Sequence, residues 1–122
     1  MLTAAQVAIE VHKSLGPGYI EAFYEHAFCI ELSRQEIPFQ RQLSYSVAYK
    51  DIEIGSHRID LVVDRRVVVE LKASRQLEDV HTAQVLSYLK ASSLQVGLLI
   101  NFSGATVRVK RVARTLPKTT AE

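Results

Sequence analysis

Cysteine, tryptophan and long apolar runs are scarce or missing in this sequence of 122 residues, and each shortage excludes a class of protein. The one cysteine, Cys29, excludes a disulfide framework and a zinc site of several cysteines, so we expect a reducing compartment, the cytoplasm. No apolar run approaches the roughly 18 residues of a membrane-spanning helix. Residues 1–15 lack a basic start followed by an apolar stretch, so no signal peptide is expected either.

The charge balance says little about partners. Lys and Arg number 15 against 13 Asp and Glu, and the formal net charge of +2 is too small to identify a nucleic-acid binder. Hydrophobic residues make up 48% of the chain and charged residues 23%, a composition typical of one folded domain. We therefore expect a single α/β domain over residues 1–114, followed by a polar C-terminal tail at residues 115–122.

Three segments have the periodicity of amphipathic helices. The first follows Thr3, which has capping-box spacing to Gln6, and it ends at the Gly-Pro-Gly sequence of residues 16–18. The second helix is expected over residues 20–35 and the third over residues 77–91. The second helix is expected to face the core with Ile20, Phe23, Ala27 and Ile30, with Phe28 as a further candidate.

Between and after these helices the sequence has the alternation of β-strands. Strands are expected over residues 39–54, 57–63, 67–73, 95–102 and 106–112. Turns are expected at Gly55-Ser56 and at Asp64-Arg65-Arg66, and Gly104 joins the last two strands. The predicted order is therefore helix, helix, strands, helix, strand, strand.

The two strands on either side of residues 64–66 each have one apolar face. These faces consist of Ile59, Leu61 and Val63 on the first strand and Val67, Val69, Leu71 and Ala73 on the second. Opposite residues of an antiparallel hairpin share a face, so only a register centred on Arg65 keeps the apolar and polar sets apart. That register places Asp60 opposite Glu70, with Cβ atoms about 5 Å apart. Lys72 lies on the same face.

Two carboxylates that face each other across a sheet repel, so Asp60 and Glu70 require something that offsets the repulsion. A divalent cation would do so, because hard cations prefer carboxylate oxygens. A salt bridge from Lys72 would do so without any metal. The residues alone leave both explanations open.

Asp60 and the segment Glu70-Leu71-Lys72 resemble the D…(D/E)-x-K signature of the PD-(D/E)XK nuclease superfamily, although Ile59 stands where the superfamily's name has proline. Residues 18–24 resemble the G-x-x-E-x-x-Y element of the GxxExxY family, a small branch of that superfamily. Residues 84–90 are similar to that family's Q-x-x-x-Y-L-K element and to the Q-x-x-x-Y box of RecB-like nucleases. The resemblance implies a restriction-endonuclease-like core, with a central mixed β-sheet flanked by helices.

The resemblance also implies roles for individual residues. Asp60, Glu70 and the backbone carbonyl of Leu71 would bind Mg²⁺ or Mn²⁺, and Lys72 would act on the attacking water and the phosphate. Glu21 matches an additional acidic metal contact of RecB-like enzymes. Its position also has an ordinary explanation, because the helix dipole favours an acidic residue in the first turn of a helix.

Residues of the third helix and the last strand complete the implied site. Gln84 would orient the signature lysine or a phosphate, and Tyr88 would line the wall of the active site. Arg108, Lys110 and Arg111 either contact phosphates of a nucleic acid or form an ordinary solvated strand face.

Taken together, these implications favour a metal-dependent nuclease that hydrolyses phosphodiester bonds in DNA. One alternative is a catalytically silent module of the same fold that binds nucleic acid or a protein partner. Another is an accessory subunit that completes a groove as a homodimer. The intact Asp60, Glu70 and Lys72 favour the enzyme, whereas the small size and modest charge favour the module.

Overall fold

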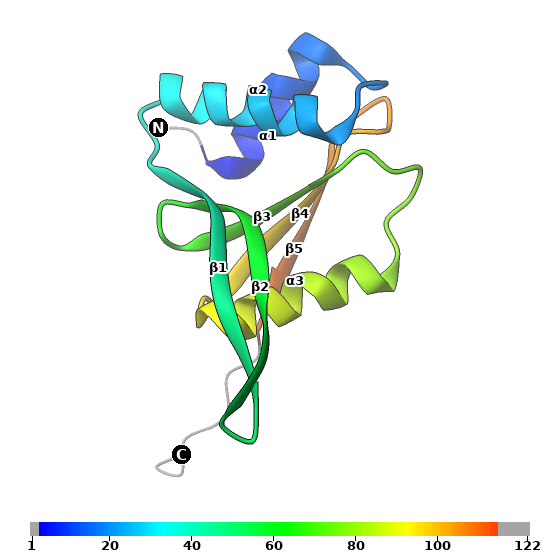
Figure 1. Cartoon of the computed structure of the whole chain (residues 1–122). Coiled ribbons are helices and arrows are strands. Elements are labelled where there is room, and N and C mark those ends of the chain that lie inside the picture. Colours follow the sequence, from blue (N-terminus) through cyan, green and yellow to red (C-terminus); the bar gives the residue numbers. More distant parts are fainter. Residues whose placement is uncertain (1–2, 115–122) are drawn as a thin grey trace, which may run out of the picture.

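The computed structural model describes residues 3–114, and this part of the chain contains a five-stranded sheet between two layers of helices (Figure 1). The elements are α1 (Ala4–Leu15), α2 (Glu21–Arg34), β1 (Phe39–Tyr49), β2 (Ile52–Val63), β3 (Val67–Lys72), α3 (Asp79–Ser92), β4 (Val96–Asn101) and β5 (Arg108–Ala113). Their order is the predicted one. The tail predicted at residues 115–122 lies outside the described residues.

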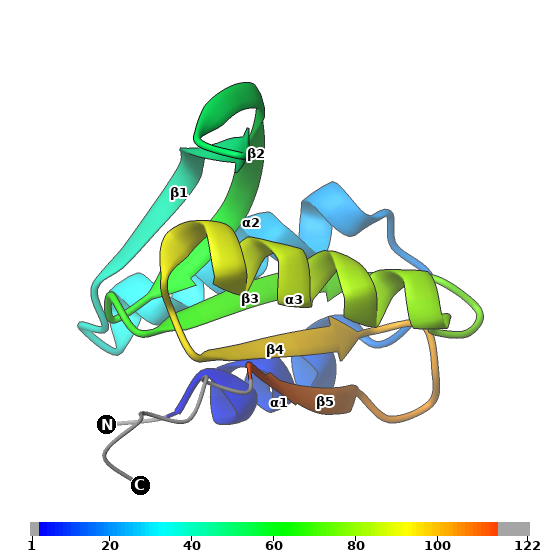
Figure 2. The ribbon, with the colours of Figure 1, turned by 90° about the horizontal axis from the view of Figure 1, so that it is seen from below.

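The sheet is mixed. Its strands follow in the order β1-β2-β3-β4-β5, and all neighbours pair antiparallel except β3 and β4, which are parallel. Helix α3 lies in the connection between β3 and β4, as the parallel pair requires. Helices α1 and α2 cover one face of the sheet and α3 covers the other (Figures 1 and 2). The predicted fold class, a restriction-endonuclease-like α/β core, is confirmed.

Two apolar clusters hold the layers together. The first lies between the sheet and helices α1 and α2, and its members include Val7, Val11, Tyr24, Phe28, Leu61, Val69, Ile100 and Phe102. The second lies under α3, and its members include Ile59, Val62, Val68, Val85, Leu89 and Leu99. Strand β3 contributes to both, because Val68 and Val69 point to opposite faces. Apolar side chains therefore cover the middle of the sheet on both faces.

The predicted start and end of the first helix are confirmed. The side chain of Thr3 accepts a hydrogen bond from the backbone of Gln6, and the side chain of Gln6 accepts one from the backbone of Thr3. The chain leaves the helix at Gly16 and Gly18, whose φ angles of 70° and 108° suit glycine. None of the helices between residues 3 and 114 has the length and apolar character needed to cross a membrane.

The core face predicted for the second helix is largely wrong. Ile20, Phe23 and Ile30 are exposed, with 63%, 56% and 50% of their surface accessible. The buried face consists of Tyr24, Phe28, Cys29 and Leu32, which confirms the further candidate Phe28, and Ala27 packs against the same cluster. This helix has apolar residues on every side, so periodicity does not determine which stripe is buried, and packing against α1 and the sheet decides it.

The turn predicted at Gly55-Ser56 is also wrong. Strand β1 ends at Tyr49, and the chain turns at Lys50 and Asp51, whose φ angles of 49° and 67° are those of a two-residue hairpin loop. Gly55 lies inside β2, next to a shift in the β1–β2 register between Val47 and Ala48. A glycine inside a strand is typical of such an irregularity.

The contact between α3 and the sheet gives a stability prediction at Gly97 of β4. A Cβ atom there would lie 2.6 Å from Cγ1 of Val85 and 3.3 Å from the backbone oxygen of Val68. We expect Gly97→Ala to lower the free energy of unfolding by about 1–3 kcal/mol, because the packed helix must move away. Gly55→Ala is the matched control, since no atom lies within 4 Å of its added Cβ. Chemical denaturation that gives both variants the same stability would contradict this packing.

Candidate active site

The hairpin of β2 and β3 has the predicted register. Leu61 pairs with Val69 and Val63 pairs with Val67, which centres the hairpin on Arg65. The paired residues end at Leu61 and Val69, one step before Asp60 and Glu70 would meet. On its other side, β3 continues beside β4 as far as Lys72. The two strands of the hairpin therefore separate where the acidic residues lie.

The single apolar face predicted for β2 is interrupted at Asp60. Ile59 packs in the cluster under α3, whereas Leu61 packs in the cluster under α1 and α2. Gln42 on β1, at the level of Asp60, has a φ angle of 58° and interrupts the β1–β2 pairing between Arg41 and Leu43. A local irregularity of this kind twists a strand and redirects its side chains. Asp60 is half-buried at this point, where β2 leaves β3.

Glu70 is the buried acid of the site, with 3% of its surface exposed. Its Oε1 atom lies 3.5 Å from Nζ of Lys72, and within the described residues its Oε2 atom has no hydrogen-bond partner. The pKa of Glu70 is raised to about 7, chiefly by burial, which Lys72 opposes and the charge of Asp60 reinforces. One oxygen of this carboxyl group is therefore unsatisfied, and a bound proton or a cation would stabilise it.

Glu21 is the first residue of α2 and approaches the site from the other helical layer. It borders a surface cavity of about 520 Å³ together with Asp60 and Leu71. Partial burial raises the pKa of Glu21, an effect that Lys72 opposes and Asp60 reinforces. Glu21 therefore lies near the predicted cluster.

Gln84 and Tyr88 form the wall on the α3 side. Tyr88 is buried, and its pKa is raised by burial first and then by the charges of Glu70 and Asp60. The side chain of Gln84 acts in the opposite sense and lowers the pKa of Tyr88, so the two side chains are neighbours on α3. The charges of Glu70 and Asp60 that act on Tyr88 place the tyrosine near the site, and the role of Gln84 stays a prediction.

The three basic residues predicted on the last strand do not share a face. In the ladder between β4 and β5, Arg108 pairs with Asn101, Lys110 with Leu99, and Arg111 with Leu98. Leu99 belongs to the cluster under α3, so Arg108 and Lys110 lie on the face that carries Glu70, while Arg111 lies on the opposite face. The prediction of one basic surface fails for Arg111, because side chains alternate along a strand.

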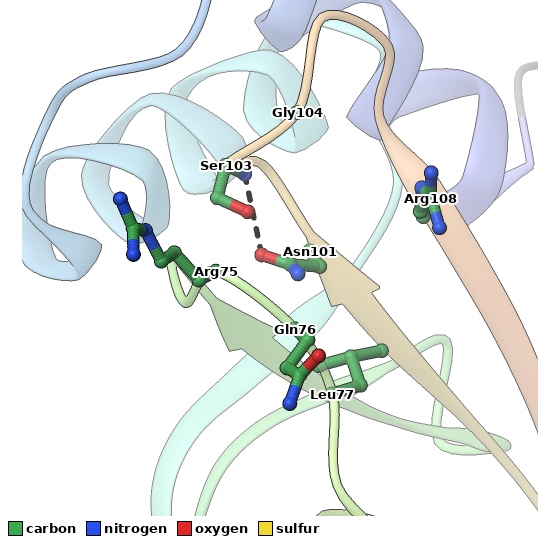
Figure 3. A pocket seen from close by; sticks show the side chains of 7 residues that line it. All are labelled: Arg75, Gln76, Leu77, Asn101, Ser103, Gly104 and Arg108. Atoms are coloured by element: carbon green, nitrogen blue, oxygen red, sulfur yellow. Dashed lines mark hydrogen bonds between the residues drawn. The ribbon is translucent and has the colours of Figure 1, made fainter.

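Sequence reasoning missed Asn101, which ends β4 and pairs with Lys72 across the parallel ladder. Its side chain is buried and accepts a hydrogen bond from the backbone N–H group of Ser103 (Figure 3). It also accepts one from the backbone N–H group of Ser74 and donates one to the carbonyl of Ser74. It thereby joins the loops that follow β3 and β4. A polar residue at the end of the apolar run 97–100 was the signal that could have identified it.

The donor set fits a divalent cation in part. Among residues 3–114, no three His, Cys, Asp or Glu side chains lie close enough together to hold a metal ion. Glu21 lies near Asp60 but does not form such a group with Asp60 and Glu70, and the metal contact that the resemblance implies for it stays a prediction. Two carboxylates and the Leu71 carbonyl remain, all of them the hard oxygen donors that Mg²⁺ prefers, and the unpartnered Oε2 of Glu70 suits such an ion.

Comparison with known proteins agrees with this geometry. A family model described as the PD-(D/E)XK nuclease superfamily matches residues 2–112, and the chain belongs to that superfamily. No curated protein matches the chain. The crystal structure of SSO0001 is similar, with a TM-score of 0.63 and 16% sequence identity over 80% of this chain. This chain spans 52% of the SSO0001 chain, and the likeness establishes the shared fold.

The raised pKa of Glu70 predicts a specific dependence of stability on pH. The pKa rises from 4.5 to about 7 on folding, so stability is fully present below pH 4.5 and is lost as the pH rises through 7. We expect Glu70→Gln to remove this loss, so that the variant exceeds the natural protein in stability by roughly 1–3 kcal/mol at pH 8 and by little at pH 4.5.

Thermal unfolding in EDTA across this pH range measures the difference. Glu10→Gln, which removes an exposed carboxylate on α1, controls for the loss of one charge. A Glu70→Gln variant whose stability follows the same pH curve as the natural protein would rule out the buried, proton-binding carboxyl group.

Proposed function

We propose that this protein is a Mg²⁺- or Mn²⁺-dependent nuclease that hydrolyses phosphodiester bonds in DNA. The observation that supports it most is the buried carboxylate of Glu70, which has one oxygen beside Lys72 and the other without a hydrogen-bond partner among residues 3–114. A structural salt bridge would leave no buried oxygen unsatisfied, because an unpaired buried polar atom is costly. In a member of the PD-(D/E)XK nuclease superfamily, this arrangement favours a cation site.

Asp60, Glu70 and the carbonyl of Leu71 are the groups that would hold the ion. When bound, the ion supplies positive charge to the phosphodiester and lowers the pKa of a coordinated water. The carboxyl group of Glu70 must lose its proton before it can hold the ion, because burial holds its pKa near neutrality. Asp60 is less buried, so it reaches the cavity while Glu70 anchors the site in the sheet.

Lys72 is the proposed catalytic cation. Its side chain is 17% exposed, and Nζ lies 3.5 Å from Glu70, so the ammonium group is held at the mouth of the site. From there it can orient a water molecule and donate hydrogen bonds to phosphate oxygens as negative charge develops on them. Tyr88 closes the same side, and the neighbouring side chain of Gln84 lowers the pKa of its hydroxyl group.

The G-x-x-E-x-x-Y element, residues 18–24, would support the proposed site structurally, which is consistent with the GxxExxY branch. Tyr24 is fully buried against Phe102, and its hydroxyl group donates a hydrogen bond of 2.5 Å to the carbonyl of Gly16. The same hydroxyl accepts one from the backbone N–H of Tyr19. These bonds fix the turn before α2, and they thereby place Glu21 beside the cavity of Asp60.

The catalytically silent module is the second candidate, and one observation favours it. No third acidic, histidine or cysteine ligand accompanies Asp60 and Glu70 among the described residues, and Lys72 already pairs with Glu70. A module of this kind would hold nucleic acid through its basic groups and would not turn it over.

Replacement of Lys72 distinguishes the two candidates. For a nuclease, we expect Lys72→Ala to lower the single-turnover rate of DNA cleavage in Mg²⁺ by about 10²-fold or more, with a smaller effect on DNA binding, because the ammonium group acts in the transition state. Lys13→Ala on α1 is the control, since that lysine is exposed and pairs only with Glu10 at 3.8 Å. A natural protein that cuts no nucleic acid in Mg²⁺ or Mn²⁺ would contradict the nuclease and leave the module.

A further inference from the structure

A second cavity, of about 390 Å³, lies at the carboxyl ends of β3 and β4. It is lined by Arg75, Gln76, Leu77, Asn101, Ser103, Gly104 and Arg108 (Figure 3). Crevices at this edge of parallel strands are common ligand sites in α/β proteins. Neither the superfamily signature nor the proposed metal site involves this cavity.

The floor of the cavity is rigid. Asn101 is 3% exposed and ties Ser74 to Ser103 through its amide group, and the hydroxyl of Ser103 donates a further hydrogen bond to the carbonyl of Ser74. The next loop is held from below, because Nε2 of buried His12 donates to the carbonyls of Phe102 and Gly104 at 3.2 and 3.0 Å. The two loops that form the cavity therefore keep their positions without a ligand.

The rim of the cavity carries two arginines and no acid. Arg75 and Arg108 lie on either side of Asn101 and Ser103 (Figure 3), and both are exposed. Within residues 3–114, neither guanidinium group forms an ion pair. The planar guanidinium group matches the geometry of phosphate oxygens, and two free ones around a preformed cavity are suited to an anion.

We propose that this cavity binds a phosphate group of the nucleic acid, next to the phosphate at Lys72. Arg75 follows Lys72 by three residues, a distance of at most about 10 Å along the chain. Asn101 pairs with Lys72 in the ladder and Arg108 pairs with Asn101, so the cavity begins beside the lysine. A nucleic-acid strand that leaves the active site past Lys72 carries its next phosphate group to the two arginines.

The inference rests on the proposed function only for the identity of the ligand, and binding without cleavage tests it separately. The test compares the natural protein with the double variant Arg75→Gln and Arg108→Gln, using fluorescence anisotropy of a single-stranded oligonucleotide in EDTA. The control variant is Arg65→Gln. Arg65 is also exposed, but it lies in the β2–β3 turn, at the opposite end of β3. Equal melting temperatures establish that all three proteins are folded.

We expect the double variant to bind about tenfold more weakly, and its slope of log affinity against log salt to be smaller by about 0.7, since each neutralised phosphate on a single strand contributes about that much. Oligonucleotides with a 5′-phosphate and a 5′-hydroxyl distinguish the source. If the double variant loses affinity for the first alone, the cavity holds a terminal phosphate, and if it loses both equally, the cavity holds an internal one.

An unchanged affinity and salt slope in the double variant would overturn the proposal, as would an equal loss in Arg65→Gln. The outcome is independent of catalysis. Cleavage that fails while the arginines still contribute to binding would count against the metal site and not against this cavity.

Discussion

The burial of one carboxylate, that of Glu70, is the constraint on which the rest of the site depends. It lies on the central strand of a sheet covered on both faces, and no group of residues 3–114 forms a hydrogen bond with its second oxygen. The ammonium group of Lys72, on the same face, offsets part of the cost of burying this negative charge. The rest of that cost is seen in the raised pKa of Glu70. Burial favours the protonated acid at this position, and in the proposed nuclease a bound cation would stabilise the carboxylate.

The fold explains why the remaining groups collect around this strand. Strand β2 leaves β3 just before Glu70, and the separation opens the sheet toward Glu21 of α2 on one side. On the other side, the parallel pairing of β3 and β4 places Lys72 level with Asn101, and the loops beyond them form the arginine-rimmed cavity. The proposed catalytic residues and the proposed phosphate site thus lie next to each other along one edge of the sheet.

Local patterns predicted the register of the β2–β3 hairpin. Alternation of apolar residues determined the pairing of Leu61 with Val69, because a slip by one residue would bury charged side chains, but it did not predict that the pairing ends before Asp60 and Glu70. The first helix was predicted equally well, since the capping box of Thr3 and Gln6 is a contact within four residues.

Features that depend on tertiary contacts were not predicted. The buried face of α2 is set by α1 and Phe102, and apolar residues on all its sides concealed it. The irregularity at Gln42, which redirects β2 at Asp60, has no signature in the sequence. The cavity of Arg75 and Arg108 joins two loops about 30 residues apart, and only the parallel pairing of β3 and β4 brings them together.

The release of protons on metal binding tests the central role of Glu70 most directly. Isothermal titration with Mn²⁺ in buffers of different ionisation enthalpy counts the protons displaced for each ion bound. Because the pKa of Glu70 is about 7, we predict close to one proton released at pH 6 and almost none at pH 9, with the difference abolished in Glu70→Gln. Binding that releases no proton at pH 6, or no binding at either pH, would contradict a metal site built on this buried carboxylate.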